Sequence, residues 1–205
     1  SAALEPRHGG SFADLTFGGG GHSRAILEAS SENNLLAMDC DPDAKDRSES
    51  FVLEFDDRFN FCDSSFRDLD QFSSAGEFDG ILMDLGISSF QLMEPLKGFS
   101  FRLDAPIDMR LDPRVGQSAA EFLETASYES LVRAVREYGE EKRWRRVVEA
   151  IIQARGTGLL SRTMSAAELV SNAVGGRNFR QRIHPATKTF QGIRIAINGE
   201  LEALA

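Results

Sequence analysis

A run of four glycines directly behind a short apolar segment constrains the fold of this chain more than any other feature. The apolar segment Phe12–Phe17 runs into Gly18–Gly21, and a helix-like stretch, Ser23–Ala29, follows. Glycine lets a backbone turn tightly and approach a ligand more closely than any Cβ would allow. A strand, a glycine loop and a helix in this order predict the nucleotide-binding turn of an α/β fold.

Three further short apolar runs continue the pattern, at Leu35–Met38, Phe59–Cys62 and Ile81–Met83. Short buried runs that alternate with helical segments predict βαβ units and a parallel sheet with right-handed crossovers. The second run ends at Asp39, where an acid accepts hydrogen bonds from ribose hydroxyls. The last run ends at Asp84, which we expect beside the cofactor because ligands bind at the carboxyl ends of parallel strands.

Two details distinguish between nucleoside cofactors. The dinucleotide fingerprint G-x-G-x-x-G needs a third glycine, and Ser23 stands at that position. Asp14, just before the glycines, would repel a pyrophosphate but suits the ammonium of a methionine moiety. We therefore expect S-adenosylmethionine (SAM) as the cofactor. A nicotinamide-dependent oxidoreductase and a purely structural glycine turn are the alternatives.

Beyond Pro95 the apolar spacing changes to that of amphipathic helices. Two segments, beginning at Ser118 and Ser165, have the form of a capping box, in which a serine caps the helix and a glutamate reaches back. Helices are expected at 128–138 and 140–155, each ended by a glycine, and after Pro185. The predicted layout is a Rossmann-like α/β domain of residues 1–94 and 183–205. A helical insertion at 95–182 interrupts it.

The charge is divided unevenly, although the net charge is −9. Residues 1–112 carry 22 acids and 9 bases, whereas residues 113–205 carry 10 acids and 14 bases. This division predicts that a phosphate backbone docks on the second half, with a solvated helix face as the alternative. The predicted contacts are two basic groups: Lys142, Arg143, Arg145 and Arg146, and then Arg177, Arg180, Arg182, His184 and Lys188.

The composition predicts a cytoplasmic protein without a metal site or a membrane segment. No run of about 18 apolar residues is present, and the first residues lack the basic and apolar character of a signal peptide. The two cysteines, Cys40 and Cys62, lack metal-ligand spacing.

Six blocks of sequence carry a resemblance to a known family, and they follow that family's order. They are Asp14–Leu27, Ala37–Asp43, Gly80–Gln91, Gly98–Pro113, Gly139–Ile151 and His184–Leu201. On these blocks the chain resembles the bacterial family of ribosomal RNA small subunit methyltransferase H, also called MraW. The resemblance implies a SAM-dependent class I methyltransferase that makes N4-methylcytidine in the decoding region of 16S rRNA, in the small ribosomal subunit. It also implies that the helical insertion recognises RNA.

The resemblance assigns the SAM contacts residue by residue, to Gly20, Gly21, His22, Asp39, Phe66, Asp84 and Gln91. Methyl transfer to the weakly nucleophilic amine of cytosine needs a hydrogen-bond acceptor that receives developing positive charge. Asp84 is the first candidate for this catalytic role and Ser88 the second.

The cytidine is expected to leave its stack, with Phe99, Phe101 and Trp144 as stacking candidates and the protein core as their alternative. Asp108 and Arg110 are candidates for a charged contact in the loop that follows, with a loop salt bridge as the alternative. A non-catalytic SAM-binding module associated with RNA remains a further alternative. The oligomeric state is open, and a homodimer is one option.

Overall fold

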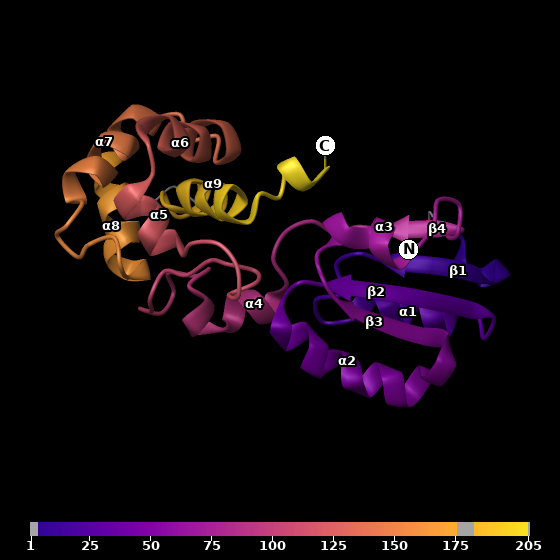
Figure 1. Ribbon diagram of the computed structural model, residues 1–205. Helices are drawn as coiled ribbons and strands as arrows, with labels where there is room; N and C mark the ends of the chain where they lie inside the picture. The colour runs from indigo at the N-terminus through magenta and orange to yellow at the C-terminus, as the bar shows by residue number, and fades with distance from the viewer. Residues whose placement is uncertain (1–3, 176–182, 205) are drawn as a thin grey trace. The chain divides into compact units, whose positions relative to one another are not determined.

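The structure is a computed structural model that describes residues 4–175 and 183–204. Its contacts divide the chain into two compact units, of which the first ends at Phe90 and the second begins at Gln91. The first unit is an α/β unit and the second is built from helices (Figure 1).

A four-stranded parallel sheet forms the centre of the first unit. Its strands are β1 (Gly10–Asp14), β2 (Asn33–Asp39), β3 (Phe59–Asp63) and β4 (Gly80–Leu82), in the order β3-β2-β1-β4. Asp14 at the end of β1 is level with Ala37 of β2 and Leu82 of β4. The four predicted strands and the Rossmann-like α/β class are thereby confirmed.

Neighbouring residues of a strand point to opposite faces of the sheet, so β1 contributes to two apolar clusters, one on each face. Phe12 belongs to the apolar cluster under α1 (Gly21–Ala29) and α2 (Pro42–Phe55). Ala13 belongs to the other cluster, to which η4 (Phe66–Asp68) and α3 (Leu69–Phe72) contribute. Right-handed crossovers from β1 to β2 to β3 place α1 and α2 on one face. The chain then crosses back to β4, which makes the boundary between β1 and β4 the topological switch point.

The second unit consists of short helices joined by loops. They are α5 (Ala119–Thr125), α6 (Tyr128–Val132), α7 (Trp144–Ala154), α8 (Thr163–Ala173) and α9 (Thr187–Asn198), with the 3₁₀ turns η5 (Pro95–Lys97) and η7 (Glu202–Leu204). A π-helical segment, η6 (Arg133–Tyr138), continues α6. The short helix α4 (Ser89–Met93) spans the boundary between the two units.

One predicted capping box is confirmed, and two predicted helix starts are corrected. Ser118 and Glu121 form the expected capping box at the start of α5. The second capping box is wrong, because α8 begins at Thr163 and Ser165 lies inside it, where its hydroxyl donates to backbone carbonyls. Helix α7 begins four residues later than expected, since the left-handed φ of +50° at Glu140 keeps the preceding turn non-helical.

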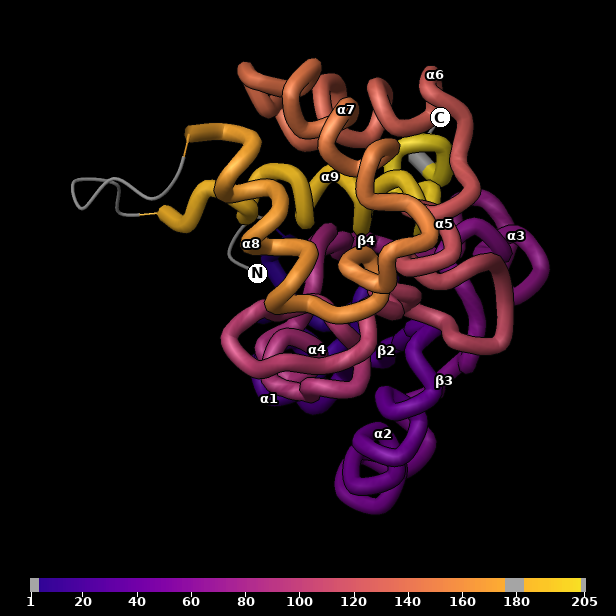
Figure 2. The backbone as a smooth tube through the Cα atoms, turned by 90° about the vertical axis from the view of Figure 1, so that its left-hand side faces the viewer, coloured from indigo at the N-terminus to yellow at the C-terminus, as the bar shows by residue number. Residues whose placement is uncertain are grey.

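The last helix, α9, lies among the helices of the second unit (Figure 2) and packs against η6. A Cβ at Gly192 would lie only 2.6 Å from the backbone nitrogen of Gly139 and closer still to the carbonyl oxygen of Ala134, so only glycine permits this approach. The contacts therefore group α9 with the helical unit, whereas the layout predicted from the sequence returned it to the sheet domain. The functional division into 1–94 with 183–205 and 95–182 stays a prediction.

No helix among residues 4–175 and 183–204 is both long and apolar enough to cross a lipid bilayer. The same residues contain no cluster of three or more His, Cys, Asp and Glu side chains with the geometry to hold a metal ion.

Candidate functional site

The carboxyl ends of all four strands meet at one edge of the sheet, because the strands are parallel. Acidic residues gather there: Asp14, Asp39 and Asp63 end their strands, and Asp84 follows β4 by two residues. The switch point between β1 and β4 opens a crevice at this edge in folds of this kind. The candidate site is therefore at this edge, around the loop that leaves β1.

Asp14 supports the loop from inside and does not face a ligand. Its side chain is fully buried, and its two oxygens accept hydrogen bonds from the Ser23 hydroxyl at 2.7 Å and the Thr16 backbone N–H at 3.1 Å. Burial raises the pKa of Asp14, and these hydrogen bonds oppose that rise. The expectation that Asp14 meets a ligand's ammonium directly is thus corrected. Ser23, at the position of the missing third glycine, instead ties α1 to the end of β1.

The peptide groups of Gly18 are held from both sides. Its N–H donates to Oδ2 of Asp39 at 2.7 Å, and its carbonyl accepts from Nε of Arg47 at 2.8 Å. Gly18 has a φ of +52°, a left-handed conformation that favours glycine. Because Asp39 ends β2 and Arg47 belongs to α2, two other elements fix the first turn of the loop.

Neighbouring aromatic rings explain why the next two loop positions are glycine. A Cβ at Gly19 would lie 2.9 Å from Cδ2 of Phe90, and one at Gly20 would lie 2.7 Å from Cε2 of Phe51. Gly21 differs, since a Cβ there would meet nothing within 4 Å. Its backbone begins α1, and the first N–H groups of a helix have no partner within the helix. The loop is packed from behind, and free space lies in front of Gly21.

Asp39 keeps acceptor capacity although it is largely enclosed. Oδ2 accepts the Gly18 N–H, and Oδ1 accepts the N–H of Asp41 at 2.9 Å. Burial raises the pKa of Asp39, while these two backbone hydrogen bonds oppose the rise. A carboxylate offers about four lone-pair sites. Two remain for the paired hydroxyls of a ribose, which agrees with the role predicted from the sequence.

The structure brings His22 and Asp84 together. Nε2 of His22 lies 3.4 Å from Oδ2 of Asp84, and the two side chains are 50% and 70% exposed. The hydroxyl of Thr16 accepts the backbone N–H of Asp84 at 2.8 Å, which fixes the end of β4 against the β1 loop. Asp84 therefore presents an accessible carboxylate at the switch point, where an incoming group can reach it.

The remaining predicted residues differ in how closely they join this site. The Cβ of Ser88 lies 3.3 Å from an ideal Cβ position at Gly18, so Ser88 is adjacent to the glycine loop. Phe66 opens η4 after β3 and packs against the cluster that contains Met38. Gln91 is buried in α4 and is the first residue of the second unit. The SAM contacts of Phe66 and Gln91 stay predictions.

Sequence reasoning missed three residues that shape the loop. Arg47 holds Gly18, Phe90 covers Gly19, and the guanidinium of Arg47 lies 5.3 Å from the centroid of the Phe90 ring. Thr16 joins β1 to β4. Apart from Thr16, these residues lie far from the loop in the chain, and no local pattern marks them.

The whole chain, residues 1–205, matches the model of the MraW methylase family. The chain belongs to this family.

Several curated relatives have the name ribosomal RNA small subunit methyltransferase H. The proteins of Thermomicrobium roseum, Cyanothece sp. and Nitrosococcus oceani are 47%, 48% and 46% identical to this chain over 98% of its length. The matches cover 63%, 66% and 65% of those relatives. This member of the MraW family thus spans slightly less than two thirds of the length of the relatives that it matches.

In the helical unit of this MraW family member, the described parts of both basic groups come together. Lys142 and Arg143 of the first group and His184 and Lys188 of the second line one cavity of about 570 Å³. A second, smaller hollow is lined by Lys142, Arg143, Arg145 and Arg146. Three predicted members lie outside the described residues: Arg177, Arg180 and Arg182.

The aromatic stacking candidates separate into three environments. Phe99 is buried in the core, as its alternative predicted. Trp144 is half-buried, and the guanidinium groups of Arg136 and Arg145 lie 5.4 and 4.4 Å from the centroid of its ring. Phe101 is partly exposed and lines a further cavity of the helical unit.

Asp108 and Arg110 form the loop salt bridge that was their alternative. Arg110 donates to the two carboxylate oxygens of Asp108 at 2.8 and 2.7 Å. Burial raises the pKa of Asp108, but the hydrogen bonds from Arg110 outweigh it, and the pKa lies below the usual aspartate range. Both side chains are mutually satisfied, so the pair stabilises the loop.

Proposed function

We propose that this chain catalyses SAM-dependent N4-methylation of a cytidine in the decoding region of 16S rRNA, within the small ribosomal subunit. The accessible carboxylate of Asp84 at the switch point, beside a glycine loop braced by Asp39, carries this proposal. Its family and the names of its relatives support it. A cytoplasmic location follows from the proposed substrate.

The residues at the strand ends fit SAM. Asp39 has lone pairs left for the two ribose hydroxyls, and the space in front of Gly21 lets a ligand approach the backbone. Gly20 and His22 complete the predicted contacts at the start of α1. Phe66 is assigned to the adenine by the resemblance. When bound, SAM supplies an electrophilic methyl group on its sulfonium.

The protein's own contribution is to orient the cytosine amine and to stabilise the charge that it gains. The lone pair of this amine is delocalised into the ring, so the amine is a poor nucleophile. Asp84 accepts a hydrogen bond from an amine N–H, which localises the lone pair and stabilises the positive charge that develops on nitrogen. His22 holds the Asp84 carboxylate towards α1, and Ser88 is a second acceptor beside the loop.

RNA recognition is assigned to the helical unit. Lys142, Arg143, Arg145 and Arg146 are all exposed, and two of them share a cavity with His184 and Lys188. Cations gathered on one surface bind a phosphate backbone through release of its counterions. The acidic first half would be repelled by the same backbone, which confines the contact to the second half.

Two rival functions predict different observations. A nicotinamide-dependent oxidoreductase would bind a dinucleotide, but the side chain of Ser23 and its bond to Asp14 occupy the place of the third glycine. A non-catalytic module would bind SAM and RNA without transferring a methyl group. Neither rival needs an exposed carboxylate at the end of β4.

Methyl transfer to small subunits tests the proposal. The chain is incubated with labelled SAM and small subunits that lack the modification, and the rRNA nucleosides are analysed by mass spectrometry. We expect N4-methylcytidine with the wild type and at least a hundredfold slower transfer with Asp84→Asn. Asp46→Asn, an exposed aspartate of α2, is the matched control and should keep full activity.

Three results separate the outcomes. SAM binding without any transfer by the wild type would support the non-catalytic module. Heat with NADH and none with SAM in calorimetry would support the oxidoreductase. Full activity of Asp84→Asn would remove Asp84 from the mechanism.

A further inference from the structure

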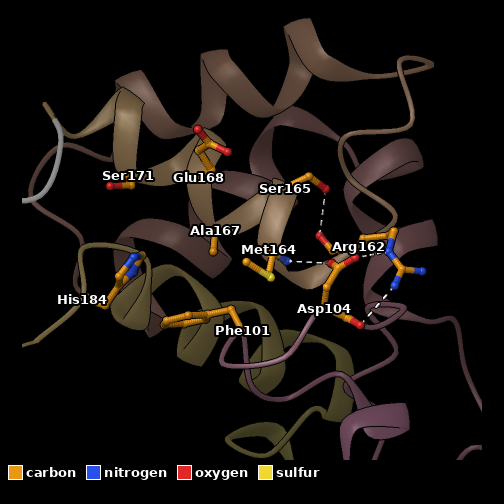
Figure 3. A pocket seen from close by; sticks show the side chains of 9 residues that line it. All are labelled: Phe101, Asp104, Arg162, Met164, Ser165, Ala167, Glu168, Ser171 and His184. Atoms are coloured by element: carbon orange, nitrogen blue, oxygen red, sulfur yellow. Dashed lines mark hydrogen bonds and ion pairs between the residues drawn. The ribbon is translucent and has the colours of Figure 1, made fainter.

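A cavity of about 440 Å³ in the helical unit is lined by different kinds of side chains from the basic cavity next to it, which contains Lys142, Arg143 and Lys188 (Figure 3). One of its walls is α8, which contributes Met164, Ala167, Glu168 and Ser171. These residues are spaced by three and four positions, so they share one face of the helix. The small side chain of Ala167 leaves room in the middle of this wall.

Two aromatic rings form another part of the wall. The centroids of Phe101 and His184 are 4.6 Å apart with 42° between the ring planes. Phe190, which is buried, packs edge-on against Phe101 at 4.9 Å. The ring of Phe101 is therefore supported by the core while it remains partly exposed, as a platform for stacking must be.

Two of the charged side chains that line the cavity, Asp104 and Arg162, form an ion pair with each other. Nε of Arg162 lies 2.5 Å from Oδ2 of Asp104, and the backbone N–H of Met164 donates to the other carboxylate oxygen at 3.3 Å. The hydrogen bond from Arg162 holds the pKa of Asp104 below its usual range. The charges of this pair compensate each other, so they do not select the charge of a ligand.

Glu168 is the charged side chain of this cavity that the structure leaves uncompensated. It makes no hydrogen bond or ion pair with any residue of 4–175 or 183–204, and it is exposed. An ionised carboxylate only accepts hydrogen bonds. A ligand that fits therefore presents hydrogen-bond donors to Glu168 and a flat face to Phe101.

The neighbouring cavity indicates the class of this ligand. His184 lines both cavities, and the neighbouring one is also lined by three cations, Lys142, Arg143 and Lys188, and by one carboxylate, that of Glu141. These cations attract a phosphate and repel a basic peptide. A flat ring with N–H donors, attached to a phosphate one cavity away, is a nucleotide.

We propose that this cavity binds an unstacked guanine of the RNA substrate, with Glu168 accepting from its Watson–Crick edge. The inference rests on the proposed function, because it assumes an RNA substrate. Guanine presents two adjacent donors, N1–H and the 2-amino group, to one carboxylate. Cytosine and adenine place a ring acceptor beside their amine, and uracil flanks its N–H with two carbonyls. Each of these three bases would therefore set an oxygen or nitrogen lone pair against Glu168.

Binding of labelled RNA pentamers to the full chain, followed by fluorescence anisotropy, tests this site. The pentamers are UUGUU, the same sequence with hypoxanthine in place of guanine, and UUUUU. Hypoxanthine lacks only the 2-amino group. We expect the wild type to bind UUGUU about tenfold more tightly than the hypoxanthine pentamer, the discrimination typical of a bidentate contact to a base.

Substitutions of matched charge identify the residue responsible. Glu168→Gln should reduce the preference for guanine to about twofold or less, while affinity for UUUUU is kept. Glu149→Gln, an exposed glutamate of α7, should keep the full preference. Fluorescence of Trp144, the single tryptophan, during thermal unfolding reports whether each variant is folded.

Four outcomes overturn the proposal or the function beneath it. Equal affinity of the wild type for all pentamers overturns the guanine site, as does a preference that survives in Glu168→Gln. Glu168-dependent binding of an oligolysine peptide without any base preference assigns the cavity to a protein partner. A guanine preference without methyl transfer to small subunits keeps the site and removes the proposed function.

Discussion

Arg47→Met should weaken SAM binding although Arg47 lies in α2, outside every predicted contact. Its Nε holds the carbonyl of Gly18 at 2.8 Å, and its guanidinium lies 5.3 Å from the Phe90 ring that covers Gly19. The variant keeps the apolar stem of the side chain and loses both of these interactions. The Gly18 carbonyl is then free to rotate, and its N–H loses its alignment with Asp39.

The size of the effect follows from these two contacts. A hydrogen bond from a charged donor contributes about 1.5–3 kcal/mol. A cation–π contact at a partly exposed site contributes about 0.5–1 kcal/mol. The sum is about 2–4 kcal/mol, and part of it is recovered when water reaches the Gly18 carbonyl. If about 1.4 kcal/mol of it maintains the shape of the loop, the Kd for SAM rises about tenfold.

Isothermal titration calorimetry of the full chain with SAM measures this change. Arg47→Lys keeps the charge but not the planar fork, so it should recover only part of the affinity. Lys45→Met removes an exposed cation of the same helix and is the matched control. A Kd for Arg47→Met within twofold of the wild type, in a protein with an unchanged melting temperature, would refute the idea that this arginine shapes the loop.

Three further predictions address stability, pH and RNA. Gly192→Ala should lower the free energy of unfolding by about 2 kcal/mol or more, because the added methyl group would meet backbone atoms. Gly21→Ala should lower it by less than about 1 kcal/mol, since a Cβ there meets nothing within 4 Å. Urea unfolding followed by circular dichroism compares the two variants. SAM affinity should fall as pH drops through the pKa of Asp39, which burial raises, because the protonated carboxyl group loses acceptor capacity. Calorimetry from neutral to acidic pH should show this loss. Asp39→Asn should bind SAM weakly at every pH. Replacement of the exposed Arg143, Arg145 and Arg146 by glutamate should weaken RNA binding at least tenfold, measured by filter binding. The Kd for SAM, measured by calorimetry, should not change. An unchanged RNA affinity would contradict the proposal that these three arginines form the docking surface.

The parts of the fold that depend on short-range pattern were predictable. The four strands, the glycine loop and α1 follow from apolar periodicity and from the conformational freedom of glycine. The capping box at Ser118 was also readable because its two residues contact each other locally. The same pattern at Ser165 failed, since Thr163 and Arg162 pair with the segment around Asp104 and start the helix three residues earlier.

The site was predictable in its residue types and not in their orientations. The sequence placed Asp14, Asp39 and Asp84 at strand ends, and the structure does the same. It could not show that Asp14 turns inward to Ser23 while Asp84 turns outward to His22. A strand end has a defined position in the sheet, but the direction of its side chain depends on which hydrogen-bond partners the neighbouring elements offer.

Sequence alone therefore determined the family, through blocks of residues along the whole chain. It also determined the order of strands and helices and the glycine turn, because these depend on contacts within a few residues of each other. Only the tertiary structure decided that Arg47 and Phe90 shape the turn, that α9 packs on η6, and that Phe101 and Glu168 share a cavity. These contacts join residues from 29 to 71 positions apart. Local propensity carries no information about such pairs, since packing of the whole unit brings them together.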